Sequence, residues 1–193
     1  MNVHFRIGVS LLAALPQLSF AQLKDETLLL RLPPGYKLAL QLTRENTVLR
    51  EIVPKSETVD DWTEMISTQV FLGAKKASLD RFHASIKRQW SAACADSTVT
   101  SPVTGNENGY AYASWVMRCM LNPSTGKPEI AIVKTIQGND SFYVVQKAFK
   151  FHPSDEQTER WGQYLRGITV CDTRLADRPC PDPKQQGFEE ILR

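Results

Sequence analysis

Residues 110–150, YAYASWVMRCMLNPSTGKPEIAIVKTIQGNDSFYVVQKAFK, decide the fold class. They contain three candidate strands in direct succession, at residues 110–120, 129–137 and 141–150. Prolines and a glycine block continuation between the first two strands, and Gly138-Asn139-Asp140 supplies residues that tolerate positive φ between the last two. The stretch therefore predicts an antiparallel meander.

Other elements are predicted on both sides of the meander. Residues 36–42 and 47–53 predict a hairpin. Residues 58–73 predict a helix, because a threonine can cap its first turn and apolar residues recur at helical spacing. Those positions are Trp62, Met65, Ile66, Gln69 and Val70. A second helix is predicted from Ser78 to about Cys94, and residues 95–108 predict a loop with at most a short strand around Val99 and Val103.

A third helix is predicted after the meander, at residues 153–167, where Ser154 and Gln157 can form a capping box. The predicted order is strand, strand, helix, helix, three strands, helix. Strands in runs and helices in runs are typical of an α+β fold, with helices packed on a largely antiparallel sheet.

The N-terminus has the organisation of a secretory signal peptide. Arg6 precedes an apolar run at residues 7–15, and Ser19-Phe20-Ala21 stands before a polar Gln22, so cleavage is expected after Ala21. An uncleaved anchor is the alternative, but the apolar run is far shorter than the roughly 20 residues that span a bilayer. We therefore expect no membrane span after cleavage.

The remaining chain has a length that suits one domain with its own core. We predict a signal peptide at 1–21, a single α+β domain at 22–170 and a disulfide-tethered C-terminal tail at 171–193. The formal net charge is only +2, with basic and acidic residues interleaved, so we expect no nucleic-acid partner. A monomer in the periplasm or outside the cell is the expected form.

The cysteines are Cys94, Cys119, Cys171 and Cys180. An even number in an exported chain predicts disulfides, and three pairings are possible. We favour Cys94 with Cys119 and Cys171 with Cys180, because the first pair joins a helix end to a strand end and the second closes a short loop. Each disulfide would stabilise the fold by about 2–4 kcal/mol. A zinc site is the alternative, but no C-x-x-C occurs.

The sequence contains none of the motifs G-x-S-x-G, G-x-x-x-x-G-K-[ST], H-E-x-x-H and G-x-G-x-x-G, so common catalytic and nucleotide-binding sites have no local support. His83 and His152 lie at no ligand spacing to the cysteines, and we predict structural or solvent-facing roles for both. We therefore expect no catalytic residue, metal or cofactor. A hydrolase combining Glu51, Glu64 or Glu129 with one of these histidines is the alternative.

Three further features have a structural and a functional interpretation. The basic face formed by Arg81, Lys87 and Arg88 is either a partner contact or, as we favour, a solvated helix surface. Residues 125–129 resemble a fragment of a phosphate loop, but they lie between strands and predict a turn. For the four tryptophans we favour core positions over a ligand cage. They are Trp62, Trp90, Trp115 and Trp161.

The runs VPKSETVDDWTEM at residues 53–65, YVVQKAF at residues 143–149 and VCDTR at residues 170–174 resemble a family of uncharacterised exported proteins of Gram-negative bacteria. That resemblance implies a compartment but no activity. The order of elements also resembles the PsbP-like group, in which helices sandwich an antiparallel sheet in small accessory or binding proteins. The export signal, the absence of catalytic motifs and this PsbP-like order of elements together predict a non-enzymatic accessory or binding protein with an unknown protein or small-molecule partner. A small exported hydrolase and a secreted factor aimed at a host or competitor cell are the alternatives.

Overall fold

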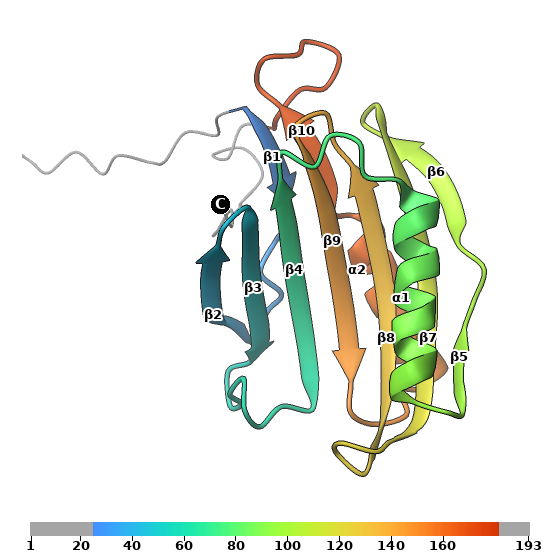
Figure 1. The fold of residues 1–193 in the computed structure, drawn as a ribbon. Coiled ribbons are helices and arrows are strands. Elements are labelled where there is room, and N and C mark those ends of the chain that lie inside the picture. Colours follow the sequence, from blue (N-terminus) through green and yellow to red (C-terminus); the bar gives the residue numbers. More distant parts are fainter. Residues whose placement is uncertain (1–24, 182–193) are drawn as a thin grey trace, which may run out of the picture.

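The computed structural model describes residues 25–181, so the expected signal peptide and most of the expected tail lie outside the described residues. The described chain forms ten strands and two helices around one main antiparallel sheet (Figure 1). In chain order they are β1 (Glu26–Leu29), β2 (Tyr36–Arg44), β3 (Thr47–Pro54), β4 (Glu64–Leu72), α1 (Leu79–Ala93), β5 (Ser97–Val99), β6 (Val103–Glu107), β7 (Tyr110–Asn122), β8 (Lys127–Gln137), β9 (Ser141–Phe149), α2 (Asp155–Arg166) and β10 (Thr169–Asp172).

The main sheet has eight strands in the order β2-β3-β4-β9-β8-β7-β5, with β6 also paired to β7. Its pairs are antiparallel, and the predicted hairpin β2–β3 and meander β7–β8–β9 are both confirmed. Helix α1 covers one face and α2 lies behind the other, together with the small β1–β10 sheet (Figure 1). The chain is thus an α+β fold, as predicted.

Both faces of the central strands are buried, which explains their almost continuous apolar sequences. On β8, Ile130, Ile132 and Ile136 belong to the core under α2, whereas Ala131 and Val133 belong to the core under α1. The two helices confirm the predicted segments at 78–94 and 153–167. Both members of the capping box at Ser154 and Gln157 are present at the start of α2.

The predicted helix at residues 58–73 is wrong, because most of this segment is strand β4. β4 pairs with β3 on one side and β9 on the other, so it is a central strand. Ile66 and Val70 pack in the core under α2, while Phe71 packs against the core under α1. Apolar residues thus occur on both faces of this strand, which weakens the alternation, and their positions coincided with a helical spacing.

Smaller differences lie at the ends of the fold. Strands β1 and β10 were not predicted, and β10 contains Cys171 and Asp172, which we had placed in the tail. Segment 95–108 contains two short strands, β5 and β6. None of Gly138, Asn139 and Asp140 has a positive φ, so the prediction that this turn uses residues with positive φ is wrong.

The favoured disulfide pairing is the one in the structure. Cys94 is joined to Cys119, with their Cα atoms 5.9 Å apart, which ties the end of α1 to β7. Cys171 is joined to Cys180, with Cα atoms 4.9 Å apart, which closes the loop after β10. Neither helix of the described chain is long and apolar enough to cross a membrane.

Candidate functional site

A lysine is fully buried in the middle of the sheet. Lys147 lies on β9, on the face toward α2, and its side chain is 0% exposed. Its Nζ donates to Glu64 Oε2 at 2.7 Å and to Tyr36 Oη at 2.9 Å. Tyr36 Oη in turn donates to the same carboxylate oxygen at 2.6 Å. Residues from β2, β4 and β9 thus form one closed hydrogen-bonded triad, which compensates for the loss of water around the ammonium.

Aromatic rings complete the surroundings of this ammonium. Lys147 Nζ lies 3.8 Å from the centre of the Trp161 ring, 4.7 Å from that of Tyr36 and 5.0 Å from that of Phe149. The faces of such rings carry negative charge density and attract cations, most strongly when water is excluded. The protein therefore fills this aromatic cage with its own lysine, and the cage is part of the core.

Burial changes the acidity of two members of the triad. It lowers the pKa of Lys147 from 10.5 to about 8, against the opposing effect of Glu64, whose carboxylate favours the ammonium. Burial also raises the pKa of the Tyr36 hydroxyl, and the hydrogen bond to Glu64 adds to that rise. Near neutral pH the triad therefore holds a charged lysine and a neutral tyrosine.

A pocket of about 440 Å³ opens beside this triad, within the volume range of typical ligand pockets. Most of its lining is aromatic ring or proline: the residues are Pro33, Pro34, Tyr36, Glu64, Arg160, Trp161 and Tyr164. Trp161 is 5% exposed, and its Nε1 is buried without a hydrogen-bond partner in the described structure. The hydrogen bonds to the Glu64 carboxylate within residues 25–181 all reach Oε2, which leaves Oε1 available. The pocket thus has largely apolar walls, and two of its lining residues carry an unpartnered polar atom, the buried Nε1 of Trp161 and Oε1 of Glu64.

A second pocket, of about 620 Å³, adjoins the first at Tyr164, which lines both. Its other lining residues include Leu29, Ile168, Pro179 and Pro181, so it too is largely apolar. Tyr164 Oη donates to the carbonyl oxygen of Arg31 at 2.7 Å, and burial raises the pKa of this hydroxyl. The two pockets are therefore neighbours along one side of α2, separated by a fixed tyrosine.

A second buried lysine, Lys134 on β8, has a structural explanation. Its side chain is 2% exposed, and its Nζ binds Glu107 Oε2 at 2.5 Å and carbonyl oxygens of Leu165, Arg166 and Ile168 at 2.7–3.3 Å. These carbonyls belong to the last turn of α2 and the residues after it, where the helix dipole favours a cation. Lys134 therefore caps α2 from the sheet, and burial lowers its pKa.

The residues considered for a hydrolase are not brought together in any of the three pockets described for this chain, the two above and one of about 340 Å³ beside Lys134. Glu64 lines one pocket without a histidine. His83 Nε2 lies 3.1 Å from the Thr100 carbonyl oxygen, and His152 is exposed. Glu129 accepts a hydrogen bond from Asn122 at 2.6 Å, and burial raises the pKa of Glu51.

The basic residues and the tryptophans that the sequence analysis considered lie in different parts of the structure. Arg81, Lys87 and Arg88 are exposed on α1. Trp115 and Trp161 are buried in the cores under α1 and α2, and Trp62 and Trp90 pack half-buried against the core under α1. Within residues 25–181, no group of three or more His, Cys, Asp or Glu side chains is arranged to hold a metal ion.

Sequence reasoning missed Lys147 and Lys134. The available signal was a lysine inside each of two apolar strands, IAIVKTI and YVVQKAF, in the predicted meander. A charged side chain in such a position must be paired or capped, because an isolated buried charge is too costly. The partners themselves lie on segments that the sequence does not connect to these strands.

No family model matches the sequence, and no curated protein matches it. Among solved structures, the Ran-binding protein Mog1p of Saccharomyces cerevisiae is 14% identical with a TM-score of 0.47, over 80% of this chain and 98% of that protein. LpqN, involved in cell envelope biogenesis of Mycobacterium tuberculosis, is 10% identical with a TM-score of 0.42, over 76% of this chain and 84% of that one. Neither similarity assigns a function to this chain.

Proposed function

We propose that this protein is an exported, non-enzymatic accessory protein that binds an apolar segment of a partner protein in the pocket between residues 33–36 and α2. One observation carries the proposal: the pocket is lined mainly by aromatic rings and prolines, and two of its lining residues, Trp161 and Glu64, have an unpartnered donor and acceptor, Nε1 and Oε1. A peptide group offers one acceptor and one donor, and an apolar side chain beside it would contact the rings.

The combined extent of the two adjoining pockets supports a protein partner over a small molecule. The 440 Å³ and 620 Å³ pockets meet at Tyr164, so an extended chain could occupy both along α2. The charged residues around the first pocket, Glu57, Glu64, Lys147 and Arg160, balance in sign, which suits an uncharged ligand segment. The walls are also fixed in advance by the triad, and this preorganisation lowers the entropic cost of binding.

An exported destination is supported by the two disulfides, because such bonds persist mainly in oxidising compartments. We further infer cleavage after Ala21 and membership of the PsbP-like sandwich group, the latter supported by one helix on each face of an antiparallel sheet. N-terminal sequencing of the native protein should begin at Gln22. A cytosolic protein that retains Met1 would contradict the export proposal.

Binding can be tested with a probe that carries one apolar side chain between two amide groups. N-acetyl-L-leucinamide should shift the Trp161 indole N–H resonance in a saturable NMR titration, with a dissociation constant on the order of millimolar because the probe is small. N-acetylglycinamide, which lacks the apolar side chain, should bind at least about tenfold more weakly if apolar contact supplies roughly 1.4 kcal/mol or more.

Two variants make this test specific. Trp161→Phe removes the indole donor and should lower the affinity for the probe. In this variant binding is followed at the resonances of the Tyr164 ring. Trp90→Phe is the matched control, because Trp90 packs under α1 on the opposite face of the sheet. Equal shifts for the leucine and glycine probes, or equal losses in both variants, would refute the binding site. Hydrolysis of an ester, peptide or glycoside substrate that a point mutation abolishes would refute the non-enzymatic role.

A further inference from the structure

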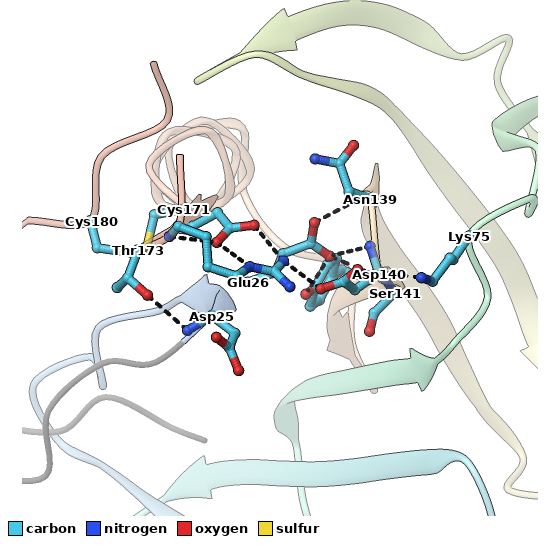
Figure 2. A network of polar contacts seen from close by, with 12 residues as sticks. Asp25, Glu26, Lys75, Asn139, Asp140, Ser141, Cys171, Thr173 and Cys180 are labelled. Carbon is cyan, nitrogen blue, oxygen red and sulfur yellow. Dashed lines mark hydrogen bonds and ion pairs between the residues drawn. A yellow bond between two sulfur atoms is a disulfide. The ribbon is translucent and has the colours of Figure 1, made fainter. Parts of the chain in front are cut away.

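A carboxylate is held by an unusual set of donors at the turn between β8 and β9. Glu26, the first residue of β1, reaches this turn from more than a hundred residues away in sequence (Figure 2). Its Oε2 accepts from the backbone N–H of Asn139 at 2.6 Å. Its Oε1 accepts from the N–H groups of Asp140 and Ser141, both at 3.1 Å, and from Tyr143 Oη at 3.0 Å.

All four donors are neutral. Within residues 25–181, no Lys or Arg side chain forms an ion pair with Glu26. The neighbouring acids differ in this respect, because Arg174 binds Asp140 at 2.5 Å and Asp172 at 2.6 Å. Successive backbone N–H groups in a turn form a concave nest that binds anions without a cation. Glu26 is therefore bound by a nest of N–H groups, whereas Asp140 and Asp172 form ion pairs with Arg174.

The nest is shaped around its occupant. A Cβ atom at Gly138 would collide with the Glu26 carboxylate, and this close approach explains the glycine at a position with ordinary φ. Gly138 N–H donates to the Ser141 carbonyl oxygen at 3.0 Å, which leaves the next three N–H groups pointing at the carboxylate. Tyr143 is 3% exposed, so its hydroxyl is a buried donor.

We propose that the β8–β9 turn is a carboxylate-binding site in its own right, occupied in cis by Glu26, and that it binds a free carboxylate once that side chain is removed. The turn forms within the hairpin of β8 and β9, whose register continues up to Gln137 and Phe142 independently of β1. In the native chain, the covalent link gives Glu26 a high effective concentration, so free carboxylates cannot compete. Occupation also fixes the register of β1 on β10, where Glu26 is paired with Asp172.

The test uses the full chain with Glu26→Ala, which empties the nest, and sodium acetate as the probe. Thermal unfolding is measured at constant ionic strength while acetate replaces chloride. An acetate concentration about ten times its dissociation constant should raise the folding equilibrium constant about tenfold. The amide resonances of Asn139, Asp140 and Ser141 should shift with the same saturation curve. If Glu26→Ala does not fold in chloride, the yield of folded protein in acetate against chloride provides the same comparison.

A matched control separates this site from general salt effects. Glu57 also accepts backbone N–H donors, from Thr63 at 2.7 Å and Glu64 at 3.5 Å, but in an exposed loop. Acetate should stabilise Glu26→Ala and leave wild type and Glu57→Ala unchanged relative to chloride. Equal effects of acetate and chloride on Glu26→Ala, or an equal acetate effect on Glu57→Ala, would overturn the proposal. Rescue by sulfate as strong as that by acetate would overturn its selectivity for carboxylates.

Discussion

Raising the pH from about 7 to about 9.5 should stabilise the folded protein by about 2 kcal/mol through Lys147 alone. Burial lowers the pKa of Lys147 to about 8 in the folded chain, whereas the unfolded chain has the ordinary value of 10.5. Near neutral pH the unfolded chain holds this proton more tightly, so the buried charge destabilises the fold by about 3 kcal/mol. The destabilisation diminishes as pH rises through the folded pKa and disappears above the unfolded one.

The assay is urea unfolding across this pH range for wild type and Lys147→Met, because the difference between them cancels the titration of other groups. Ile132→Met is the matched control. Ile132 is the register partner of Lys147 and is buried in the same core, so its replacement changes packing without removing a charge. The measurements stop below about pH 10. Burial raises the pKa of Tyr36 and Tyr164 in the folded chain, so at higher pH these tyrosines ionise first in the unfolded chain, and the folded state loses stability. A difference between wild type and Lys147→Met that stays constant with pH would refute the reasoning.

The remaining predictions concern stability. Replacing Cys94 and Cys119 by alanine should cost about 3–4 kcal/mol, because that disulfide spans 25 residues, and replacing Cys171 and Cys180 should cost about 2–3 kcal/mol for a span of 9. Denaturant unfolding of the two variants checks the order, and a larger loss for the shorter loop would contradict the loop-entropy explanation. Ser154→Ala removes the N-cap of α2 and should cost about 1 kcal/mol, measured in the same way. An unchanged stability would show that the capping box contributes little.

The sequence predicted elements whose signals are local. Helix α2 was recognised because its capping box and apolar stripe lie within one continuous segment. The hairpin β2–β3 and the meander β7–β8–β9 were recognised from turn residues between apolar runs. Strand β4 was missed because it lies inside the sheet and carries apolar residues on both faces, with Ile66 and Val70 on the face under α2 and Met65 and Phe71 on the other. A short strand with apolar residues on both faces shows no strict alternation, and its sequence is then compatible with helix or strand.

Strand β1 and the polar sites were missed for a different reason, since each depends on contacts between distant segments. β1 has only four residues, and its partner β10 lies more than a hundred residues later. Glu26 looks like an ordinary exposed acid in the sequence, yet its ligands are backbone N–H groups of a turn more than a hundred residues later. Lys147 could have been noticed as a charge inside an apolar strand, but its partners Glu64 and Tyr36 could not have been identified.

The two faces of the sheet differ in the charged side chains that they bury, and this difference bears on the proposed binding site. Within residues 25–181 the face under α1 buries no charged side chain, and Phe82 packs there on Trp115 and Phe142. The face under α2 buries Lys134 and Lys147 on strands that are otherwise apolar. Apolar residues of similar volume often stabilise a core as well as buried ion pairs do, so stability alone gives no reason to place charges on one face. The pockets beside α2 border these charges, and a rigid, polar-anchored wall is what a recognition surface requires. The α2 side is therefore where binding should be sought, and the α1 side supplies the matched controls.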